Sequence, residues 1–339
     1  MTTAMDILVV AETQGDVLAP ITCEILGLAN RLTGDIGGTV AAVAFVSAAD
    51  SIGEELVAHG AEQVYLVKHP AFATCTTDAW LPDLEKIVRD RRLTLILIGH
   101  TTRGADIAPC LAFRLNAAVV TDTVAIAKKD RRFTLTRTCY GGKAREIVTS
   151  HTEMVVATVR AKSQPAATRD ATRKGKIASL TSVCDPAQLR VRVIEHQLRS
   201  HEGQRLEDAE VVIAAGRGLR GAEGVALANE LAALLNGAVG ATRAACDMGW
   251  CPYSSQIGLS GVTVAPDLYF ALGVSGAGQH MVGCLSAGTI VAVNNDPDAA
   301  IFAYSRFGVV GDCREILPAF IEEVRKLKNQ DQTKQLGEK

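Results

Sequence analysis

The feature that most constrains the fold of this chain is an alternation of short, continuous apolar runs with segments of helical spacing. A strand that is apolar at every position must be buried on both faces, which is typical of a parallel sheet covered by helices. The first hundred or so residues therefore predict one such sheet. Its expected strands are residues 7–10, 40–46, 63–67 and 95–98, and its expected helices are residues 18–32, 51–59, 81–90 and 106–115.

The pattern changes after Val119. Residues 133–138 and 154–159 alternate apolar and polar side chains, so we expect antiparallel additions to the sheet. Residues 160–176 are basic and poor in apolar side chains, which predicts an exposed, extended segment, with a functional basic arm as the alternative. Strand-like alternation resumes at residues 191–198.

A second series of apolar runs begins at Val211 and predicts a second sheet. A length of 339 residues also favours two domains. We expect an N-terminal α/β domain at residues 1–205, a doubly wound C-terminal domain at 206–327 and a polar, frayed tail at 328–339. The strands of the second series are expected at residues 211–215, 238–241, 268–274, 289–293 and 309–310, and its helices at 225–235 and 315–327.

The bulk composition argues against several classes of protein. A net charge of -2 and a pI near 6.4 provide no field that attracts nucleic acid. No apolar run approaches the ~18 residues of a membrane-spanning helix, and the N-terminus lacks the basic region of a signal peptide. The nine cysteines lack CxxC spacing, which disfavours a disulfide framework or a metal site. We therefore expect a cytoplasmic protein without metal.

Small and polar residues follow the strands of the second series at the point where each strand ends. The carboxyl ends of parallel strands share one edge, and ligands bind there in open sheets. A glycine-rich stretch that opens a helix suits a pyrophosphate, asparagine and aspartate suit sugar hydroxyls or an adenine edge, and arginine suits a ring that gains negative charge. Together these types favour a dinucleotide with a redox-active ring. The groups are Gly216, Arg217 and Gly218, then Thr242 and Arg243, Ser275 to His280, Asn294 and Asp296, and Asp312.

Each of these pieces also has a plain structural interpretation. Gly216-Arg217-Gly218 is equally typical of a turn, and a lone His280 at a helix start is more often a capping or core residue. Asn295-Asp296-Pro297 is a common turn or helix N-cap signal. No GxGxxG fingerprint stands in the required context.

Long stretches of the chain resemble the α subunit of electron transfer flavoproteins, and the likeness covers nearly the whole chain. In the N-terminal half the similar stretches are GHTTRGADIAPCLAFRLNAAVVTD (99–122) and MVVATVRA (154–161). In the C-terminal half they are GRGLRG (216–221), VGATRAACDMGW (239–250), SQIGLSGVTVAPDLYFALGVSGAGQHMVG (255–283), VAVNNDPDAAIF (291–302) and FGVVGD (307–312).

The resemblance implies a heterodimer of α and β subunits that holds FAD mainly in the C-terminal domain of this chain. The N-terminal domain would then be a scaffold that docks the β subunit. The flavin would accept electrons from dehydrogenases, typically of the acyl-CoA type, and pass them to a quinone reductase or another acceptor. The chain would be an electron carrier with no catalytic residue of its own.

The resemblance also implies roles for individual residues. Arg243 would lie against the isoalloxazine ring, the Ser260 hydroxyl would be offered to flavin N5, and His280 would sit near flavin O2. Asn294 and Asp312 would hold the AMP half. The pyrophosphate and ribityl region would be lined by Arg217, Thr242, Ser275, Gly276, Ala277, Gly278, Gln279 and His280, and Gln256, Ile257, Gly258 and Leu259 would complete the cofactor site beside Ser260.

Four positions depart from the commonest family pattern. Leu259-Ser260 replaces a Gln-Thr pair, Gly278 replaces a bulkier aliphatic residue, and Thr242 replaces a serine. These departures bear on the redox potential rather than on FAD binding. One alternative within the family is an electron-bifurcating, NADH-oxidising complex with a second FAD in the β subunit. Alternatives from other classes are a non-redox nucleotide-binding scaffold and an NAD-dependent enzyme.

Overall fold

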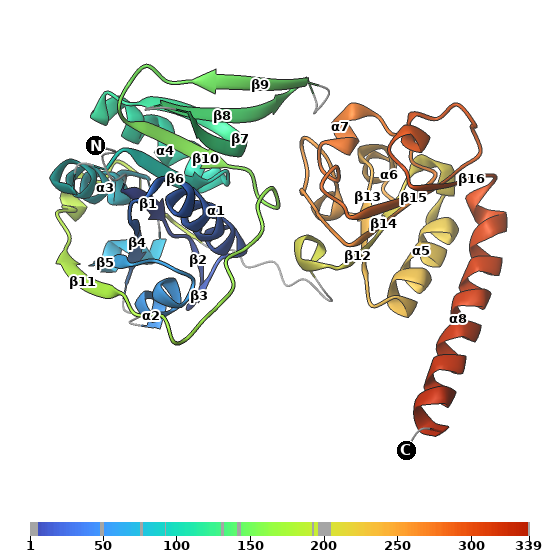
Figure 1. The fold of residues 1–339 in the computed structure, drawn as a ribbon. Coiled ribbons are helices and arrows are strands. Elements are labelled where there is room, and N and C mark those ends of the chain that lie inside the picture. Colours follow the sequence, from blue (N-terminus) through green and yellow to red (C-terminus); the bar gives the residue numbers. More distant parts are fainter. Residues whose placement is uncertain are drawn as a thin grey trace. The chain divides into compact units, whose positions relative to one another are not determined.

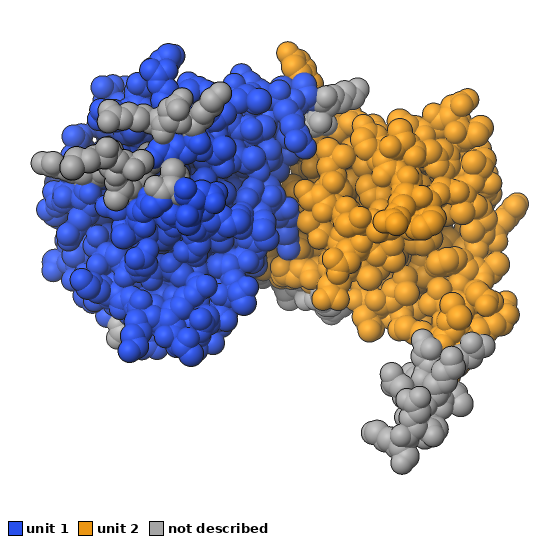
Figure 2. All heavy atoms as spheres, in the orientation of Figure 1, with its two compact units in different colours: residues 1–139, 144–197 blue, residues 140–143, 198–339 orange. Residues whose placement is uncertain are grey.

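The chain folds into two compact α/β units. The computed structural model describes residues 6–47, 51–74, 77–91, 93–129, 132–140, 144–191, 193–195 and 205–337. The first unit comprises residues 1–139 and 144–197, and the second comprises residues 140–143 and 198–339 (Figure 2). Each unit has its own sheet, so the expected fold class is confirmed. The expected boundary near residue 205 adjoins residues 196–204, which lie outside the described residues, and it stays a prediction.

The first unit contains a nine-stranded sheet whose central part is parallel. The strand order is β11-β5-β4-β1-β6-β10-β7-β8-β9, and the pairs β7–β8 and β8–β9 are antiparallel. The strands are β1 (Ile7–Val10), β4 (Val40–Val46), β5 (Gln63–Lys68), β6 (Leu95–Gly99), β7 (Ala118–Lys129), β8 (Arg132–Cys139), β9 (Ala144–Thr149), β10 (Val155–Val159) and β11 (Lys176–Thr181), with a small separate hairpin of β2 (Thr13–Gln14) and β3 (Val17–Leu18).

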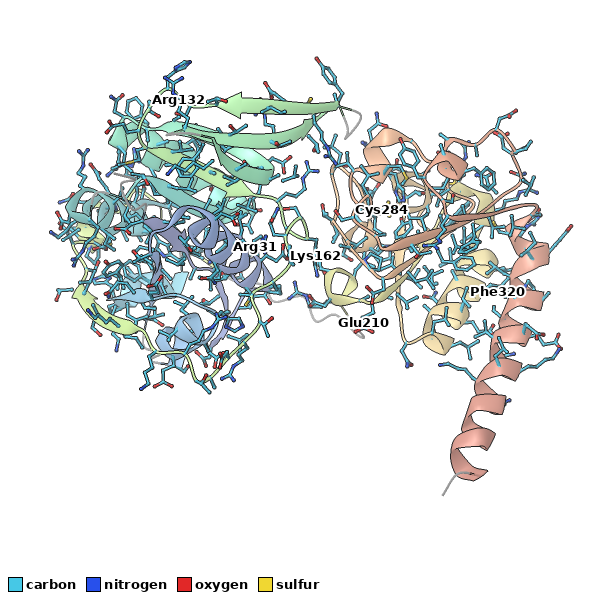
Figure 3. The ribbon with its side chains drawn as sticks, viewed as in Figure 1. Arg31, Arg132, Lys162, Glu210, Cys284 and Phe320 are labelled. Carbon is cyan, nitrogen blue, oxygen red and sulfur yellow. The ribbon has the colours of Figure 1, made fainter. Side chains whose placement is uncertain are left out.

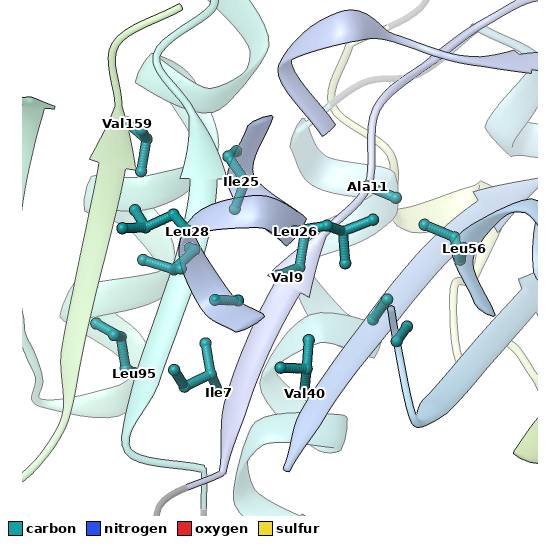
Figure 4. Close-up of a cluster of buried hydrophobic side chains, with 14 of the residues drawn as sticks. Ile7, Val9, Ala11, Ile25, Leu26, Leu28, Val40, Leu56, Leu95 and Val159 are labelled. Atoms are coloured by element: carbon teal, nitrogen blue, oxygen red, sulfur yellow. The ribbon is translucent and has the colours of Figure 1, made fainter. Parts of the chain in front are cut away.

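Helices cover both faces of this sheet (Figure 1). Successive residues of β1 point to opposite faces, so Ile7 and Val9 pack with α1 and α2, in the cluster shown in Figure 4, while Leu8 and Val10 pack with α3 and α4. A strand placed between two layers of helices needs an apolar residue at every position, as the sequence analysis assumed. The four helices are α1 (Pro20–Ile36), α2 (Ser51–Ala58), α3 (Thr77–Arg91) and α4 (Thr102–Leu115).

Strand β10 corrects one prediction, because residues 154–159 do not form an antiparallel addition. The strand pairs in parallel with β6 on one side and β7 on the other, and all five of its residues are buried. Its alternation comes from Thr158, whose buried hydroxyl bonds to His100 Nδ1 at 2.9 Å and accepts from the backbone N–H of Asp122 at 2.9 Å. A polar residue with internal partners therefore imitates the pattern of a half-exposed strand. The antiparallel prediction for residues 133–138 is confirmed by β8.

Strand β11 was not predicted from the sequence, and neither were β7, β9 and the hairpin of β2 and β3. Strand β11 pairs in parallel with β5 at the edge of the sheet, from Lys176 to Thr181. The strand predicted at residues 191–198 is wrong for its described residues, since residues 191 and 193–195 lie in no strand, and residues 192 and 196–198 lie outside the described residues. Val191 and Ile194 are exposed instead of facing a core.

The segment before β11 is extended and mostly on the surface, as predicted for residues 160–176. It is also attached to the helices beside it. The N–H of Ala167 donates to the carbonyl of Cys23 in α1 at 2.8 Å, and Arg169 pairs with Glu55 in α2 at 2.7 Å. These bonds favour the structural interpretation over a free basic arm.

The second unit is built on a five-stranded parallel sheet in the order β13-β12-β14-β15-β16. One face packs against α5, α6 and α8, and the other packs against α7 and irregular segments such as the one around Ile257 and Val264. The strands are β12 (Val211–Ala215), β13 (Ala238–Ala241), β14 (Leu268–Leu272), β15 (Thr289–Asn294) and β16 (Phe307–Val310), and the helices are α5 (Ala222–Leu234), α6 (Arg243–Asp247), α7 (Gly278–Met281) and α8 (Cys313–Gly337).

The end of the second unit contains a long helix, α8, and an exposed edge strand, β16. Helix α8 continues to Gly337, beyond its predicted end at Leu327, so residues 328–337 of the expected frayed tail are helical. Strand β16 forms one edge of the sheet, and all four of its residues are exposed. Among the described residues, no helix has the length and apolar character needed to cross a membrane.

We predict that adding a side chain at Gly27 will destabilise the first unit. A Cβ atom at Gly27 in α1 would lie 2.4 Å from the carbonyl oxygen of Pro165, which belongs to the backbone of the extended segment. Overpacking of this kind costs about 1–3 kcal/mol, so Gly27→Ala should lower the urea midpoint of unfolding. Gly34→Ala in the same helix is the matched control, because its Cβ meets no atom within 4 Å and a gain of about 0.5–1 kcal/mol is expected. Equal effects of the two variants would show that the segment is not packed at Gly27.

Candidate functional site

A large cavity of about 1230 Å³ lies at the carboxyl edge of the second sheet. Small-molecule pockets usually measure about 300–1,000 Å³, so this one suits a ligand of dinucleotide size. The loops that follow β12, β13, β14 and β15 line it, together with the turn at residues 256–260. Of the residues predicted from the sequence, the cavity is lined by Arg217, Gly218, Thr242, Arg243, Gln256, Ile257, Gly258, Leu259, Ser260, Ser275, Ala277, Gln279, His280, Asn294 and Asp296.

The strand order explains why the cavity forms at this place. The chain passes from β12 to β13 on one side and then crosses to β14 on the other, so the loops after β12 and β14 leave in different directions. The two loops nevertheless touch at their bases, where a Cβ atom on Gly273 would lie 2.5 Å from the Cα of Gly218. Gly273 also has φ of 63°, a conformation that other residues rarely adopt. The two glycines therefore let the loops pack closely at the base of the cavity, and the loops diverge above that point.

A row of unpaired backbone N–H groups follows β14. Within the described part of the chain, the N–H groups of residues 275–279 donate to no protein acceptor. Gly276 allows this path, because its φ is 81° and a Cβ there would lie 2.2 Å from the backbone nitrogen of Ile301. Helix α7 is only four residues long, so its dipole contributes less than the sequence analysis assumed. Consecutive unpaired N–H groups are an anion-binding arrangement in their own right.

The turn at residues 256–260 carries the predicted hydroxyl donor. Gln256 is buried, and its Nε2 donates to Ser260 Oγ at 3.0 Å. The N–H of Leu259 donates to the carbonyl of Gln279 at 2.7 Å, which ties the turn to α7. Because Ser260 Oγ already accepts from Gln256, its own proton is free to be donated to a ligand.

His280 is buried, and both of its ring nitrogens have partners within the protein. Nε2 lies 2.7 Å from the hydroxyl of Tyr269, and Nδ1 lies 3.1 Å from the carbonyl oxygen of Ile257. Burial lowers the pKa of His280 to about 4, with the Ile257 carbonyl acting weakly in the opposite direction. The imidazole is therefore neutral at physiological pH.

The cations of the site come from the loops after β12 and β13. Thr242 caps α6 by accepting from the N–H of Ala245, which fixes the start of the helix that carries Arg243. The Arg243 side chain is 74% exposed, and its Nε lies 3.5 Å from a carboxylate oxygen of Asp247. A surface pair of this kind is weak, so Arg243 is free to turn toward a ligand.

Four predicted residues do not line the cavity: Gly216, Gly276, Gly278 and Asp312. Asp312 is bound to arginines, with Arg314 at 3.1 Å and Arg220 at 3.7 Å, and the hydrogen bonds from Arg314 lower its pKa to about 2. It reaches the cavity only through Arg220, which does line it. Asn294 lines the cavity, but its amide holds the loops together by donating to the carbonyl of Val274 at 2.8 Å.

Several lining residues were not predicted. Asn295 directly follows β15, so the same strand-end reasoning that selected Asn294 and Asp296 extends to it. Ala299 and Ala300 carry no signal in the sequence, because they reach the cavity through a tertiary bond from the N–H of Ile301 to the carbonyl of Ser275. The full set of unpredicted lining residues is Arg220, Ala244, Gly273, Val274, Asn295, Asp298, Ala299 and Ala300.

The chemistry of the lining fits a flavin dinucleotide. Unpaired N–H groups suit the pyrophosphate, a serine with a free proton suits a ring nitrogen, and an exposed arginine suits a ring that becomes negative on reduction. The cavity also has the volume that such a ligand requires. The fit therefore rests on the orphaned donors and on the size of the cavity.

In comparisons with known proteins, both units match domains of electron transfer flavoproteins. Residues 7–183 match the family model of the electron transfer flavoprotein domain, and residues 205–285 match that of the electron transfer flavoprotein FAD-binding domain. The chain is 35% identical to the electron transfer flavoprotein subunit alpha of Bacillus subtilis over 95% of this chain and 98% of the relative. It is 32% identical to the subunit alpha of Megasphaera elsdenii (95% and 97%), and 31% identical to Protein FixB of Azotobacter vinelandii (92% and 88%).

We predict that Gly278→Pro will weaken FAD binding by removing one N–H group from the row. Ala277 has φ of -57° and ψ of 138°, which suits the residue before a proline, and proline is tolerated at the first position of a helix. A hydrogen bond to a charged group contributes about 1.5–3 kcal/mol, so the dissociation constant should rise by roughly tenfold to a hundredfold. Gly278→Ala keeps the N–H group and serves as the control in a flavin fluorescence titration. Equal losses in the two variants would mean that the N–H of residue 278 does not bind the cofactor.

Proposed function

Because this chain belongs to the electron transfer flavoprotein α-subunit family and its C-terminal unit is an FAD-binding domain, we propose that it forms the FAD-holding part of a one-electron relay. The observation that supports the proposal best is the row of unpaired N–H groups at residues 275–279, beside a cavity large enough for FAD. Bound FAD would supply the redox chemistry. The protein would supply binding, orientation and charge.

Different residues of the cavity would bind different parts of the cofactor. The N–H groups of residues 275–279 would hold the pyrophosphate, and Ser260 would donate its hydroxyl proton to the ring. Arg243 would place its cation against the ring, where reduction adds negative charge. Asn294 would support the AMP half indirectly, by joining the loops after β14 and β15. Asp312 would act through Arg220 rather than by direct contact.

An electron transfer flavoprotein α subunit implies a β subunit as its partner. We propose that the first unit is the scaffold on which the β subunit docks and that the heterodimer works in the cytoplasm. Support comes from the match of residues 7–183 to the family model of the electron transfer flavoprotein domain. We propose that the electron donor is a dehydrogenase of the acyl-CoA class and that the acceptor is a quinone reductase or a similar protein.

A flavin count on the purified heterodimer tests this function. One FAD per heterodimer, reduced by an acyl-CoA dehydrogenase with its substrate and not by NADH, is the expected result. Two FAD molecules together with NADH oxidation would replace the simple carrier with an electron-bifurcating complex. A heterodimer that retains no flavin would overturn the proposal and favour a nucleotide-binding scaffold.

We predict that Arg243→Gln will lower the midpoint potential of the first electron more than it weakens FAD binding. Removing a cation beside a ring that gains negative charge disfavours reduction, and a tenfold to hundredfold change in the equilibrium corresponds to roughly 60–120 mV. FAD affinity should change by less than about tenfold, because the pyrophosphate contacts persist. The measurement is a spectroelectrochemical titration of the heterodimer.

The matched control is Arg325→Gln. Arg325 in α8 pairs with Glu230 in α5, and neither residue lines the cavity. An unchanged potential in Arg243→Gln, or an equal change in both variants, would show that Arg243 does not lie against the ring.

A further inference from the structure

A chain of polar contacts on the surface of the second unit ends at Arg243, which lines the cavity. Nε of Arg243 lies 3.5 Å from Oδ2 of Asp247, and the hydroxyl of Tyr253 donates to Oδ1 of the same carboxylate at 2.9 Å. Each oxygen of Asp247 therefore has a partner of its own. Neither Asp247 nor Tyr253 lines the cavity. Figure 3 draws the side chains of this unit as sticks.

The local fold of residues 243–255 brings the three side chains together. Arg243 and Asp247 are the first and last residues of α6, and their spacing of four places them on one face of the helix. Gly249, with φ of 73°, turns the chain just after the helix. Tyr253 then begins the next helical turn, and its side chain lies beside the end of α6, where it meets Asp247.

The order of the two charges in α6 is the reverse of the order that stabilises a helix. An anion is favourable near the amino end of a helix and a cation near its carboxyl end, but here Arg243 comes first and Asp247 last. The two side chains are also 74% and 49% exposed, and an ion pair at the surface contributes little to stability. The position of Arg243 at the cavity explains the arrangement better than the stability of α6 does.

The hydroxyl of Tyr253 changes what Asp247 offers to Arg243. A hydrogen bond from a neutral hydroxyl stabilises the charge of a carboxylate and so reduces its attraction for a nearby cation. The contact acts on the tyrosine as well, because the hydrogen bond to Asp247 raises the pKa of Tyr253, while the charge of Arg243 acts in the opposite direction. At neutral pH the tyrosine therefore keeps the proton that it donates.

We propose that Tyr253 is a positioning residue for Arg243: by donating to Asp247, it weakens the pair between the carboxylate and the guanidinium and leaves the cation available to the flavin ring. Without this hydroxyl, Asp247 would compete more strongly with the ring for Arg243. The effect on the flavin rests on the function proposed above, whereas the contact between Tyr253 and Asp247 does not depend on it.

Difluorotyrosine in place of Tyr253 tests the contact directly, because its hydroxyl ionises near neutral pH and its fluorine NMR signal reports the ionisation. The heterodimer is titrated with and without the substitution Asp247→Asn. Removing the carboxylate should lower the pKa of the fluorinated hydroxyl. The same pKa in both proteins would overturn the proposal, whether or not flavin is bound, so this result is separable from a failure of the proposed function.

Tyr253→Phe tests the effect on the flavin, because it removes the hydroxyl and keeps the aromatic ring. Asp247 should then attract Arg243 more strongly, so the midpoint potential of the first electron should fall. A change of roughly threefold to tenfold in the equilibrium corresponds to about 30–60 mV for one electron. Tyr304→Phe is the control, since Tyr304 belongs to the same unit and does not line the cavity. An unchanged potential in Tyr253→Phe would contradict the proposal.

Combined variants show whether the effect passes through Asp247 and Arg243. Asp247→Asn should raise the potential, because Arg243 loses a competing partner, and adding Tyr253→Phe to this variant should cause no further fall. In a chain that carries Arg243→Gln, Asp247→Asn should change the potential much less. A further fall in the first combination, or a full effect in the second, would mean that these residues do not act through Arg243 and would overturn the proposal.

Discussion

Parallel pairing of the five strands of the second sheet is the constraint on which the rest of the structure depends. Because β12 to β16 all run in the same direction, every loop that follows a strand leaves from one edge. The reversal of strand order beside β12 then separates two of those loops and creates the cavity between them. Residues from Arg217 to Asn294 meet there although they lie far apart in the sequence. The chemistry of the site is thus a consequence of chain direction.

The site is made of backbone as much as of side chains. The stretch after β14 leaves consecutive N–H groups without protein acceptors, and glycines such as Gly273 and Gly276 allow the path that produces this arrangement. Unpaired polar groups are unfavourable unless water or a ligand satisfies them, so the strained stretch is held by its surroundings. The amide of Asn294 and the bond from Ile301 to Ser275 provide that support.

The sequence was most informative where one local rule decides the structure. Continuous apolar runs predicted the buried strands, and the residues at the strand ends predicted most of the cavity lining. Prediction failed where a tertiary partner overrides the pattern. Thr158 alternates like a surface residue but is buried with His100 and Asp122 as partners, and the edge strand β11 is too exposed for an apolar signal. Likewise, nothing local shows that Asp312 pairs with Arg220 or that both nitrogens of His280 have partners.

The exposed edge strand β16 has a consequence for the solubility of the chain. Phe307, Val309 and Val310 are exposed on a strand whose outer backbone groups pair with no other strand in the described part of the chain, and such edges are templates for intermolecular pairing. The strand is short, and Arg306 and Asp312 flank it, as gatekeeper charges do beside aggregation-prone segments. Resistance to self-association in this part of the molecule therefore depends on these two charges and on the short length of β16. A change that lengthens the strand or neutralises Arg306 or Asp312 would remove that protection.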